Sequence, residues 1–474
     1  CDQFDGWTYE YNTFGCTNQC NPIVNPPSIT LLYPPNQSST GYFPLSFNFT
    51  AVDDDSLLLK CSLMVDNRTV FINNSVSNST LSTIKYYPPL GNHSWKIVCY
   101  DQGYIKSTSE ERQFTAVPGT CECSSKQECE SAFNSSACLT ALLMANISIN
   151  GTFIDYQSAF YNRTFDCNGN TITGNGTGTA FYLSNNNSFN KIQNCNISGF
   201  SRGINSNISN GQSNSNNTFS NLSISNATYG LYISTSSAAL TASSSNHTFS
   251  NLSISNATYG IYVTSGSSKS IFYAFSNILI SGTPNGIYFY TYADGNTNTV
   301  ISSNHTFSNI AISNASSNAV MFYSQSTFPR SIFIGSCSFS NISIVNSPTG
   351  FNFLTQDCVD VSSNSFSNIS ISGVSRGFNV AAHDCSNFNS NSFSGISINN
   401  TMDGIYMNTS APGNRATSIR YNSFSNISIY NATNGIFLQA DSPPSYPGQI
   451  ANMSSNSFFN ISIRNSTNGF IFNI

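Results

Sequence analysis

The chain has 474 residues, only 8% of them are charged, and its formal net charge is −5. Soluble domains carry roughly 25% charged residues, so Asn, Ser and Thr must solvate much of this surface. No basic cluster indicates nucleic acid or anionic lipid as a partner, and no stretch is long and apolar enough to span a membrane. Because few carboxylates would change charge on acidification, we hypothesise an acidic or otherwise harsh external habitat.

The 14 cysteines favour disulfides formed in an oxidising compartment. A metal site is the competing interpretation, but the four cysteines between 121 and 138 do not form paired C-x₂-C motifs, and the chain has only 4 His. We therefore expect no cofactor. Roughly thirty N-x-S/T sequons, against roughly seventeen expected by chance, favour an N-glycosylated, extracellular or cell-surface protein.

Residues 1–26 form a tail or linker with Cys1, Cys16 and Cys20 that ends in a Pro-rich hinge. A leading cysteine is either a lipidated residue or half of a disulfide, and the nearby cysteines favour the disulfide. The tail is also a candidate assembly strand.

Residues 27–118 alternate apolar and polar side chains, as in LSFNFTA and LKCSLMV, which predicts short strands with one buried face. Cys61 and Cys99 lie on two such strands with Trp95 close by, so we expect a β-sandwich with a disulfide between its sheets. The segment resembles the immunoglobulin-like modules of prokaryotic surface proteins. That resemblance implies a spacer or an adhesive unit.

Residues 119–160 form a Cys-rich segment, in which QECESAFNSSACLTALLMA (127–145) is predicted to be a helix. A helix placed just before a solenoid can cover the open edge of its first coil. The cysteines expected to form disulfides here are Cys121, Cys123, Cys129 and Cys138.

Residues 161–474 are repetitive, and the segment FSNLSISNATYG occurs identically at 219–230 and 249–260. Five residues after the Phe that opens each of nine copies there is always an Ile, which predicts a strand with one buried face. Eleven residues after the Phe there is Gly, with Asn318 as the single exception. Because Asn tolerates positive φ, we expect a left-handed corner in this Gly column. The repeats predict a right-handed parallel β-helix of about ten or eleven coils.

Asn recurs in two further columns. Two residues after each Phe it persists where the sequon is broken, which favours a ladder of stacked amides at Asn221, Asn251, Asn277, Asn309, Asn341, Asn368, Asn426 and Asn460, with Gly395 as the outlier. Five residues further on, Asn lies in complete sequons and is a better glycan candidate. The expected glycosylation sites are Asn36, Asn67, Asn78, Asn92, Asn175, Asn216, Asn226, Asn246, Asn256, Asn304, Asn314, Asn399, Asn408, Asn431, Asn452 and Asn465.

From about residue 160 the chain resembles the pectate-lyase-like superfamily of right-handed β-helices, of the carbohydrate-binding and sugar-hydrolase repeat type. The matching elements are DCNGNTITG and the recurring N-x-I-x-N…G-I-Y pattern. With the Cys-rich helical entry, the arrangement resembles large surface proteins of archaea. The resemblance implies the fold, whereas this fold hosts lyases, hydrolases, adhesins and structural rods.

Catalytic candidates are few. Asp357 and Asp384 each lie nine residues before a Phe and so stack in adjacent coils, where two carboxylates could act as acid and base on a glycosidic bond or share a cation. The alternative is that they are loop residues beside Cys358 and Cys385, which we expect to form an inter-coil disulfide. Basic groups that would neutralise an acidic sugar are scarce, and Arg330, Arg376, Arg415 and Arg420 share no column, so we expect no enzyme.

The function we expect is that of a structural surface glycoprotein. The last coil has no polar cap, which favours head-to-tail assembly with copies of itself into a filament or lattice. An alternative is a carbohydrate-binding adhesin, with Tyr288, Tyr290 and Tyr292 in exposed loops stacking on sugars, although the same spacing would also fit one face of a strand. The second alternative is a polysaccharide lyase or glycoside hydrolase.

Overall fold

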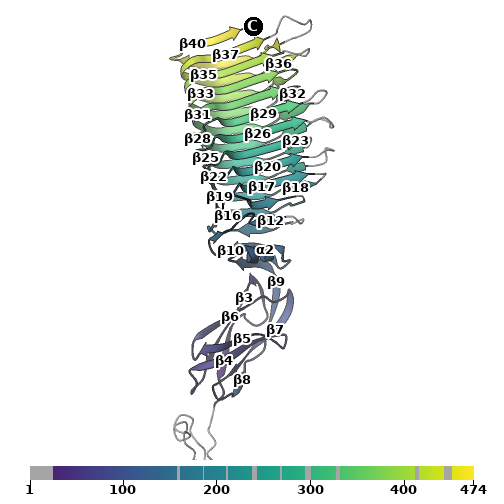
Figure 1. The fold of residues 1–474 in the computed structure, drawn as a ribbon, viewed down its shortest axis with the longest axis vertical. Helices are drawn as coiled ribbons and strands as arrows, with labels where there is room; N and C mark the ends of the chain where they lie inside the picture. The colour runs from purple at the N-terminus through teal and green to yellow at the C-terminus, as the bar shows by residue number, and fades with distance from the viewer. Residues whose placement is uncertain are drawn as a thin grey trace, which may run out of the picture. The chain divides into compact units, whose positions relative to one another are not determined.

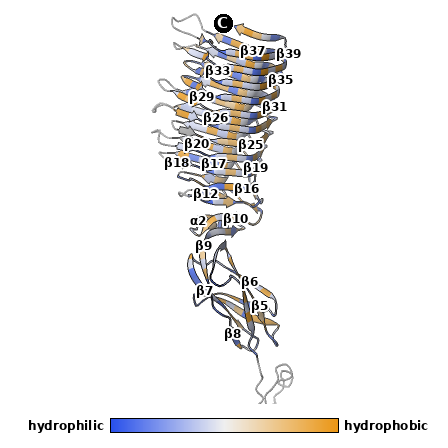
Figure 2. Ribbon diagram, turned by 180° about the vertical axis from the view of Figure 1, so that it is seen from behind, coloured by the Kyte–Doolittle hydropathy of each residue, from blue (hydrophilic) through white to orange (hydrophobic). Residues whose placement is uncertain are grey.

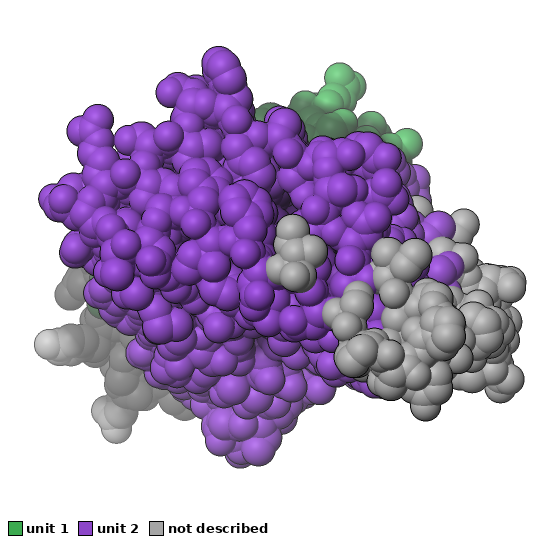
Figure 3. Space-filling model, turned by 90° about the horizontal axis from the view of Figure 1, so that it is seen from above, with its two compact units in different colours: residues 1–123, 129–142 green, residues 124–128, 143–474 purple. Residues whose placement is uncertain are grey.

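A computed structural model of the chain describes residues 25–156, 161–184, 186–209, 212–236, 243–266, 269–293, 300–326, 331–411, 416–441 and 451–473. The chain divides into two compact units (Figure 3). One contains the residues up to Cys123 together with Cys129–Leu142, and the other contains Ser124–Glu128 and the chain from Leu143 onward. The tail on which head-to-tail assembly would depend, including Cys1, Cys16 and Cys20, lies outside the described residues.

The N-terminal unit contains two β-sheets. The first consists of β1 (Ser28–Tyr33), β3 (Leu45–Val52) and β6 (Leu81–Tyr86), paired antiparallel. The second consists of β2 (Ser38–Phe43), β9 (Arg112–Cys123), β7 (Gly91–Tyr100), β4 (Leu58–Val65) and β5 (Arg68–Ser77), with β8 (Lys106–Thr108) also beside β7. Its core centres on Phe47, whose ring lies 5.0 Å from Trp95 and 5.6 Å from Phe114 in edge-to-face contacts.

The disulfide between Cys61 and Cys99 is present, but it does not link two sheets. These residues lie directly opposite each other in β4 and β7, which are neighbouring strands of one sheet, with their Cα atoms 4.1 Å apart. The expectation of an inter-sheet disulfide was therefore wrong. Phe47 of the first sheet packs on Trp95 and Phe114 of the second, and no disulfide between described cysteines joins the two sheets.

Helix α2 (Lys126–Asn134) corresponds to the first half of the helix expected over 127–145, whereas the second half was predicted wrongly, because it forms strand β10 (Cys138–Leu143). The first turn of α2 is capped reciprocally, because Ser125 Oγ accepts from the Glu128 N–H while the Glu128 carboxylate accepts from the Ser124 N–H. The disulfides Cys121–Cys138 and Cys123–Cys129 tie this short segment together. The division between the two compact units falls within the helix.

The C-terminal unit is a parallel β-solenoid, in which each coil adds one strand to each sheet (Figure 1). We call its first sheet the Phe sheet. It comprises β13 (Thr164–Asp166), β14 (Thr171–Thr173), β16 (Lys191–Ser198), β19 (Thr218–Ser225), β22 (Thr248–Ser255), β25 (Ala274–Ser281), β28 (Thr306–Ser313), the first halves of β31 (Ser338–Gln356), β33 (Ser365–His383), β35 (Ser392–Ser410) and β37 (Ser423–Asp441), and β39 (Ser457–Arg464), with β11 (Ile147–Ser148) beside β14.

We call the second sheet the Tyr sheet. It comprises β12 (Ile154–Tyr156), β15 (Thr179–Leu183), β17 (Arg202–Ser209), β20 (Tyr229–Ser236), β23 (Tyr259–Gly266), β26 (Asn285–Ala293), β29 (Asn318–Ser326), the second halves of β31, β33, β35 and β37, and β40 (Asn468–Asn473).

The third sheet has nine strands: β18 (Ser213–Ser215), β21 (Ser243–Ser245), β24 (Lys269–Ile271), β27 (Val300–Ser303), β30 (Ile332–Gly335), β32 (Val359–Ser362), β34 (Asn387–Asn389), β36 (Thr417–Arg420) and β38 (Ala451–Asn452). This corresponds to about nine full turns, against the ten or eleven coils expected. The overcount arises because the described coils before β18 have no strand in this sheet.

The Phe that opens each repeat stacks on the Phe of the next coil. Phe307 and Phe339, for example, have ring centroids 4.7 Å apart and planes within 1° of parallel. This separation matches the spacing of about 4.8 Å between neighbouring strands. Apolar and polar residues alternate along the strands (Figure 2), and the Ile five residues after each Phe is buried in every coil from Ile224 to Ile429. The repeat therefore builds a continuous apolar column inside the solenoid.

The Gly column does not mark left-handed corners. Its members, such as Gly230 and Gly377, have no positive φ, and the residue that replaces Gly in the register is Ala319 and not Asn318. The actual constraint is steric: a Cβ on Gly377 would lie 2.4 Å from the carbonyl oxygen of Gly404 in the next coil. Glycine is needed here because successive coils approach each other closely.

A polar column also runs inside the solenoid, two residues before each Phe. In most coils its side chain accepts a hydrogen bond from the backbone N–H at the same position of the preceding coil, at 2.9–3.2 Å. Its members, in chain order, are Asn190, Asn217, His247, Tyr273, His305, Cys337, Asn364, Asn391, Asn422 and Asn456. The column satisfies backbone donors where the coil turns between sheets.

Candidate functional site

The outer face of the Tyr sheet is the candidate site, and we call it the Tyr face. Alternate residues of each strand point away from the core and align from coil to coil. One column runs Asn205, Tyr232, Tyr262, Tyr288, Met321, Asn352, Asn379, Tyr406 and Phe437. A second column, three residues earlier in each strand, runs Arg202, Tyr229, Tyr259, Asn285, Asn318, Thr349, Arg376, Asp403 and Asn434.

The tyrosine rings of this face stack on one another along the solenoid. Tyr262 lies 5.4 Å from both Tyr232 and Tyr288, with each pair of planes 6° apart. In the neighbouring column, Tyr229 and Tyr259 stack at 5.2 Å. Since each ring face is covered by the next ring, the hydroxyl groups and ring edges are what the face offers to a ligand.

Tyr288, Tyr290 and Tyr292 lie in strand β26 and not in exposed loops, so the loop placement was wrong. All three are half-buried and stack with other tyrosines. Burial raises the pKa of Tyr288 to about 12 and raises the pKa of Tyr262 further. Both hydroxyls therefore remain protonated hydrogen-bond donors at any physiological pH.

An arginine lies at the N-terminal end of the tyrosine stack. The Arg202 guanidinium lies 4.4 Å from the centre of the Tyr232 ring and 5.6 Å from that of Tyr229. Its Nε atom is buried without a hydrogen-bond partner in the described part of the chain. A pocket of about 370 Å³ opens beside it, lined among others by Asp155 and Tyr182. The pocket continues the Tyr face onto the earlier coils.

A polar network occupies the C-terminal half of the face. Arg376 donates to Asp403 at 3.2 Å and to Asn379 at 3.1 Å, and its guanidinium lies 4.2 Å from the Tyr406 ring centre. The Asn379 amide donates to Asn352 at 2.7 Å. Asp403 is 3% exposed, so the ion pair neutralises a buried carboxylate. The face as a whole is thus polar but nearly uncharged.

The sequence interpretation did not single out this network. Arg376 was noted only as sharing no column with Arg330, Arg415 and Arg420, whereas the register places it in one column with Arg202, six coils away. The signal lay in the residues that flank each Gly, such as Tyr229 before Gly230 and Tyr232 two residues after it. These positions become a face only once the register between coils is known.

The two fallback catalytic residues lie at a corner and not on the Tyr face. Asp357 and Asp384 follow the Tyr-sheet halves of β31 and β33, are half-buried, and have φ values of 58° and 38°. The expected disulfide Cys358–Cys385 links the same two coils, with Cα atoms 4.5 Å apart. A further disulfide, Cys167–Cys195, joins two earlier coils and was not anticipated.

The structure brings together the Asn side chains for which a ladder was expected. All but Asn426, which follows Gly395 in the column, donate their amide to the Asn of the preceding coil, as Asn251 does to Asn221 at 3.0 Å, and each ladder Asn has a positive φ near 54°. The second Asn column, which includes Asn226 and Asn256, has positive φ as well. Asn346 and Asn400 occupy it without a sequon. Left-handed corners therefore account for Asn in both columns.

The expected glycosylation sites differ in their surroundings. Asn36, Asn67, Asn92, Asn175, Asn226, Asn246, Asn256, Asn314, Asn431 and Asn465 are exposed. Asn78 is instead engaged on both sides of its amide, because its Oδ1 accepts from the Asp53 N–H and its Nδ2 donates to the Asp53 carbonyl. The Oδ1 of Asn408 is buried on the Tyr face. The Asn78 amide is thus held by hydrogen bonds, whereas the buried Oδ1 of Asn408 has no hydrogen-bond partner among the described residues.

No protein-family model and no curated protein matches the chain. Solved structures that it resembles include the catalytic domain of a GH87 alpha-1,3-glucanase in complex with nigerose, at 11% identity and a TM-score of 0.47, covering 95% of this chain and 96% of that one. A Family 28 exopolygalacturonase of Yersinia enterocolitica has 9% identity and a TM-score of 0.24, covering 93% and 99%. The pectate lyase PelI from Erwinia chrysanthemi, in complex with tetragalacturonic acid, has 9% identity and a TM-score of 0.13, covering 73% and 85%.

The expectation of a non-enzymatic protein is contradicted by these comparisons, since the three proteins are glycoside hydrolases and a pectate lyase. At this level of identity the likeness concerns the fold and assigns no residue of this chain a role. Five disulfides join described cysteines, which is typical of proteins that fold in an oxidising compartment. No helix among the described residues is long and apolar enough to cross a membrane.

Proposed function

We propose that this chain recognises carbohydrate, and that it binds an extended, largely uncharged polysaccharide along the Tyr face. The observation that carries the proposal is the row of tyrosine hydroxyls and side-chain amides along successive coils, which Met321 interrupts once; its members are Tyr232, Tyr262, Tyr288, Asn352, Asn379 and Tyr406. A polysaccharide presents hydroxyl groups at regular intervals, and a solenoid presents matching groups once per coil, about 4.8 Å apart.

The chemistry of the face favours a neutral glycan. The hydroxyls of Tyr262 and Tyr288 stay protonated, so they donate to sugar oxygens and also accept from sugar hydroxyls. The charge of Arg376 is matched by Asp403 on the same face. A polyuronate would need several unpaired cations in register, and the described part of this face offers Arg202 at one end. Recognition would thus rest on hydrogen bonds and not on charge.

The test compares tyrosines on and off the face. In the full-length protein, Tyr262→Phe and Tyr288→Phe remove two hydroxyls but keep the ring stack, while Tyr421→Phe makes the same change at an exposed tyrosine after β36. Affinity electrophoresis against a panel of neutral and acidic polysaccharides gives the readout. We expect the double variant to bind its neutral glycan about ten- to thirtyfold more weakly, because two hydrogen bonds are lost. The proposal would be refuted if the neutral glycan retained the double variant as strongly as it retained Tyr421→Phe. It would also be refuted if only polyuronates retained the wild type.

A second candidate function is hydrolysis of a polysaccharide by Asp357 and Asp384 at the corner that follows the Tyr sheet. They come from the same position of neighbouring coils, where the adjacent cysteines have Cα atoms 4.5 Å apart. Carboxyl groups about 5 Å apart are typical of retaining glycosidases, in which one is the nucleophile and the other the acid and base. By contrast, Asp403 and Asp441 cannot form such a pair, because Asp441 lies seven residues, or about 23 Å, along β37 from the register partner of Asp403.

Release of reducing ends from the same polysaccharide panel tests this candidate. Asp357→Asn and Asp384→Asn should each abolish release while leaving retention in the gel unchanged, and Asp441→Asn should affect neither. Release that persists in both variants would exclude these residues as the catalytic pair.

We further propose that the N-terminal unit is an immunoglobulin-like spacer and that α2 covers the first coil of the solenoid. We also propose that the protein is an N-glycosylated, archaeal-type surface protein. The two-sheet packing around Trp95 and the disulfides beside α2 support the first two proposals. Filament assembly has no support in the described contacts. Carbohydrate recognition is therefore the function that we put forward.

A further inference from the structure

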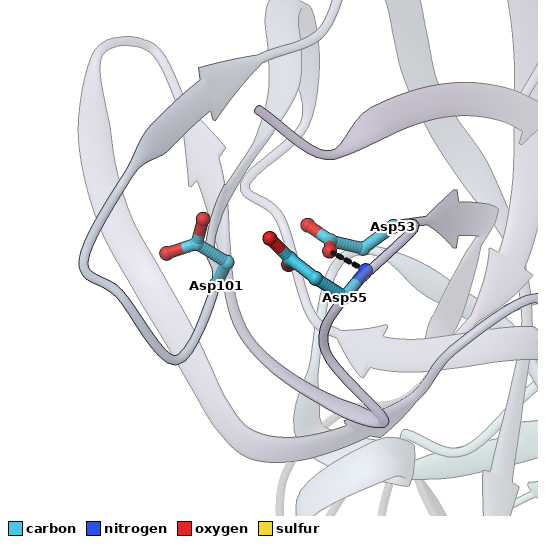
Figure 4. A group of neighbouring side chains, drawn as sticks. All are labelled: Asp53, Asp55 and Asp101. Atoms are coloured by element: carbon cyan, nitrogen blue, oxygen red, sulfur yellow. Dashed lines mark hydrogen bonds between the residues drawn. The ribbon is translucent and has the colours of Figure 1, made fainter. Parts of the chain in front are cut away.

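Three carboxylates converge in the N-terminal unit. Asp53 and Asp55 lie in the loop between β3 and β4, and Asp101 directly follows β7 (Figure 4). One ligand oxygen from each lies within 4.8 Å of the others. Asp53 and Asp101 are only 6% and 5% exposed. Burying negative groups so close together is costly unless a positive charge or hydrogen bonds compensate.

Each buried carboxylate has one oxygen fixed by the backbone. Asp53 Oδ1 accepts from the Asp55 and Ser56 N–H groups, both at 3.0 Å, and Asp101 Oδ1 accepts from the Ile105 N–H at 2.6 Å. The Asn78 amide holds the backbone of Asp53 through two further hydrogen bonds. Both side chains are thus positioned by their surroundings before any ligand binds.

The second oxygen of each carboxylate has no hydrogen-bond partner. Oδ2 of Asp53 and Oδ2 of Asp101 are buried and unsatisfied within the described part of the chain. None of the ion pairs among the described residues involves Asp53, Asp55 or Asp101. Two buried anionic oxygens without a donor point to a cation as the missing partner.

We infer that Asp53, Asp55 and Asp101 form a Ca²⁺ site in the N-terminal unit. Calcium takes six to eight oxygen ligands at about 2.3–2.6 Å, so oxygens up to about 5 Å apart can share one ion. Three carboxylates supply part of this shell, and the partly exposed Asp55 leaves room for water ligands. Magnesium binds at about 2.0–2.1 Å in a near-ideal octahedron, which this spread of oxygens fits less well.

Electrostatics within the cluster agree with this inference. The ligand oxygens of the three carboxylates lie within 4.8 Å of one another, and two of the three side chains are almost fully buried. The carboxylates therefore repel one another, and a divalent cation relieves that repulsion. The ion would join the β3–β4 loop to the segment after β7, two parts of the unit that are distant in sequence.

Direct binding to the full-length protein tests the site. After chelation and desalting, CaCl₂ and MgCl₂ are titrated calorimetrically into the wild type and into Asp55→Asn, Asp101→Asn and Asp54→Asn. Asp54 lies in the same loop outside the cluster and provides the control. Extracellular calcium modules have Kd values of roughly 0.1–1 mM, so titration to about 10 mM covers the range.

We expect both cluster variants to lose one equivalent of bound Ca²⁺, and Asp54→Asn to retain it. Hydrogen exchange measured by mass spectrometry guards against a folding defect: in the wild type, Ca²⁺ should protect peptides covering 52–58 and 100–106. Calcium uptake unchanged in both cluster variants, equal loss in Asp54→Asn, or equal protection by Mg²⁺ would overturn the assignment.

Discussion

Acidification should destabilise the solenoid through two buried histidines, His247 and His305. They are 1% and 0% exposed and lie in the internal polar column. In each, Nδ1 accepts a backbone N–H from the preceding coil at 3.2 Å, and Nε2 is paired with a serine hydroxyl at 2.9 Å or 3.0 Å. A proton on Nδ1 would remove that acceptor and bury a charge. Burial accordingly lowers the pKa of both histidines to about 3.

The size of the effect follows from linkage. Between the unfolded pKa of about 6.5 and the folded pKa of about 3, the unfolded chain binds one more proton per histidine, so the free energy of unfolding rises with pH in this window. At about 1.36 kcal/mol per pH unit, lowering the pH from 6.5 to 4.5 costs about 2.7 kcal/mol per histidine, or about 5 kcal/mol for the pair. The loss levels off below about pH 3.

The matched variant is His247→Asn with His305→Asn, because Asn is the residue that other coils place in this column and it offers the same acceptor. Urea unfolding of both proteins at pH 7.0 and 4.5 gives the readout. All carboxylates are shared, so the difference between the two pH dependences isolates the histidines. We expect the wild type to lose about 5 kcal/mol more than the variant. An identical loss in both proteins would refute the reasoning.

This prediction bears on the habitat inferred from composition. A surface poor in carboxylates changes its charge little on acidification, which favours stability at low pH. Two neutral histidines in the interior act in the opposite direction, because they lower the free energy of unfolding as the pH falls. The pair therefore weighs against adaptation to strong acid.

Two further substitutions test the packing between coils. Gly377→Ala should destabilise by about 1–3 kcal/mol, because its Cβ would meet the Gly404 carbonyl, whereas Gly469→Ala in the last coil, with nothing within 4 Å, should be nearly neutral in the same urea assay. Phe307→Ala should cost about 3–5 kcal/mol by opening the stacked column, whereas Phe459→Ala, at a residue 73% exposed, should cost far less. Equal losses within either pair would contradict this account of the packing.

The repeat made the solenoid predictable, because a residue that recurs once per coil must stack on itself. Phe and Ile recur as single residue types, so their columns were visible in the sequence. The internal polar column was not visible, because Asn, His, Tyr and Cys occupy it in different coils. These residues share their position in the coil, and most of them accept a backbone hydrogen bond, but they share no residue type. The function of this column depends on geometry that residue identity does not reveal.

The Gly column shows a different limit. The recurrence of Gly was visible in the sequence, but it was attributed wrongly to left-handed corners, because positive φ and close approach of two backbones both select Gly. The register between coils distinguishes these two causes. It also shows that Ala319, and not Asn318, occupies the Gly position in that coil. Likewise, two cysteines on alternating strands did not reveal whether the strands belong to one sheet or two.

The candidate sites were the least predictable part. The acidic run 53–55 is visible in the sequence, but Asp101 joins it only through the fold. The Tyr face depends on the alignment of coils 26 to 33 residues apart, which varies along the chain. Interactions between distant residues decide both sites, and a single sequence does not record those distances.

The Asn ladder gives a last prediction, on glycosylation. In consecutive Asn-bearing coils the ladder Nδ2, such as that of Asn251, already donates to the preceding coil, and its neighbours in the ladder lie about 4.8 Å away. Sugar rings on consecutive members would collide, so we expect these sites to be empty in protein from an N-glycosylating host. Exposed sequons outside both columns, such as Asn67 and Asn175, should be occupied. Peptide mapping after enzymatic deglycosylation in H₂¹⁸O reads out each site, and labelling of both Asn221 and Asn251 in one molecule would show that the ladder cannot form as described.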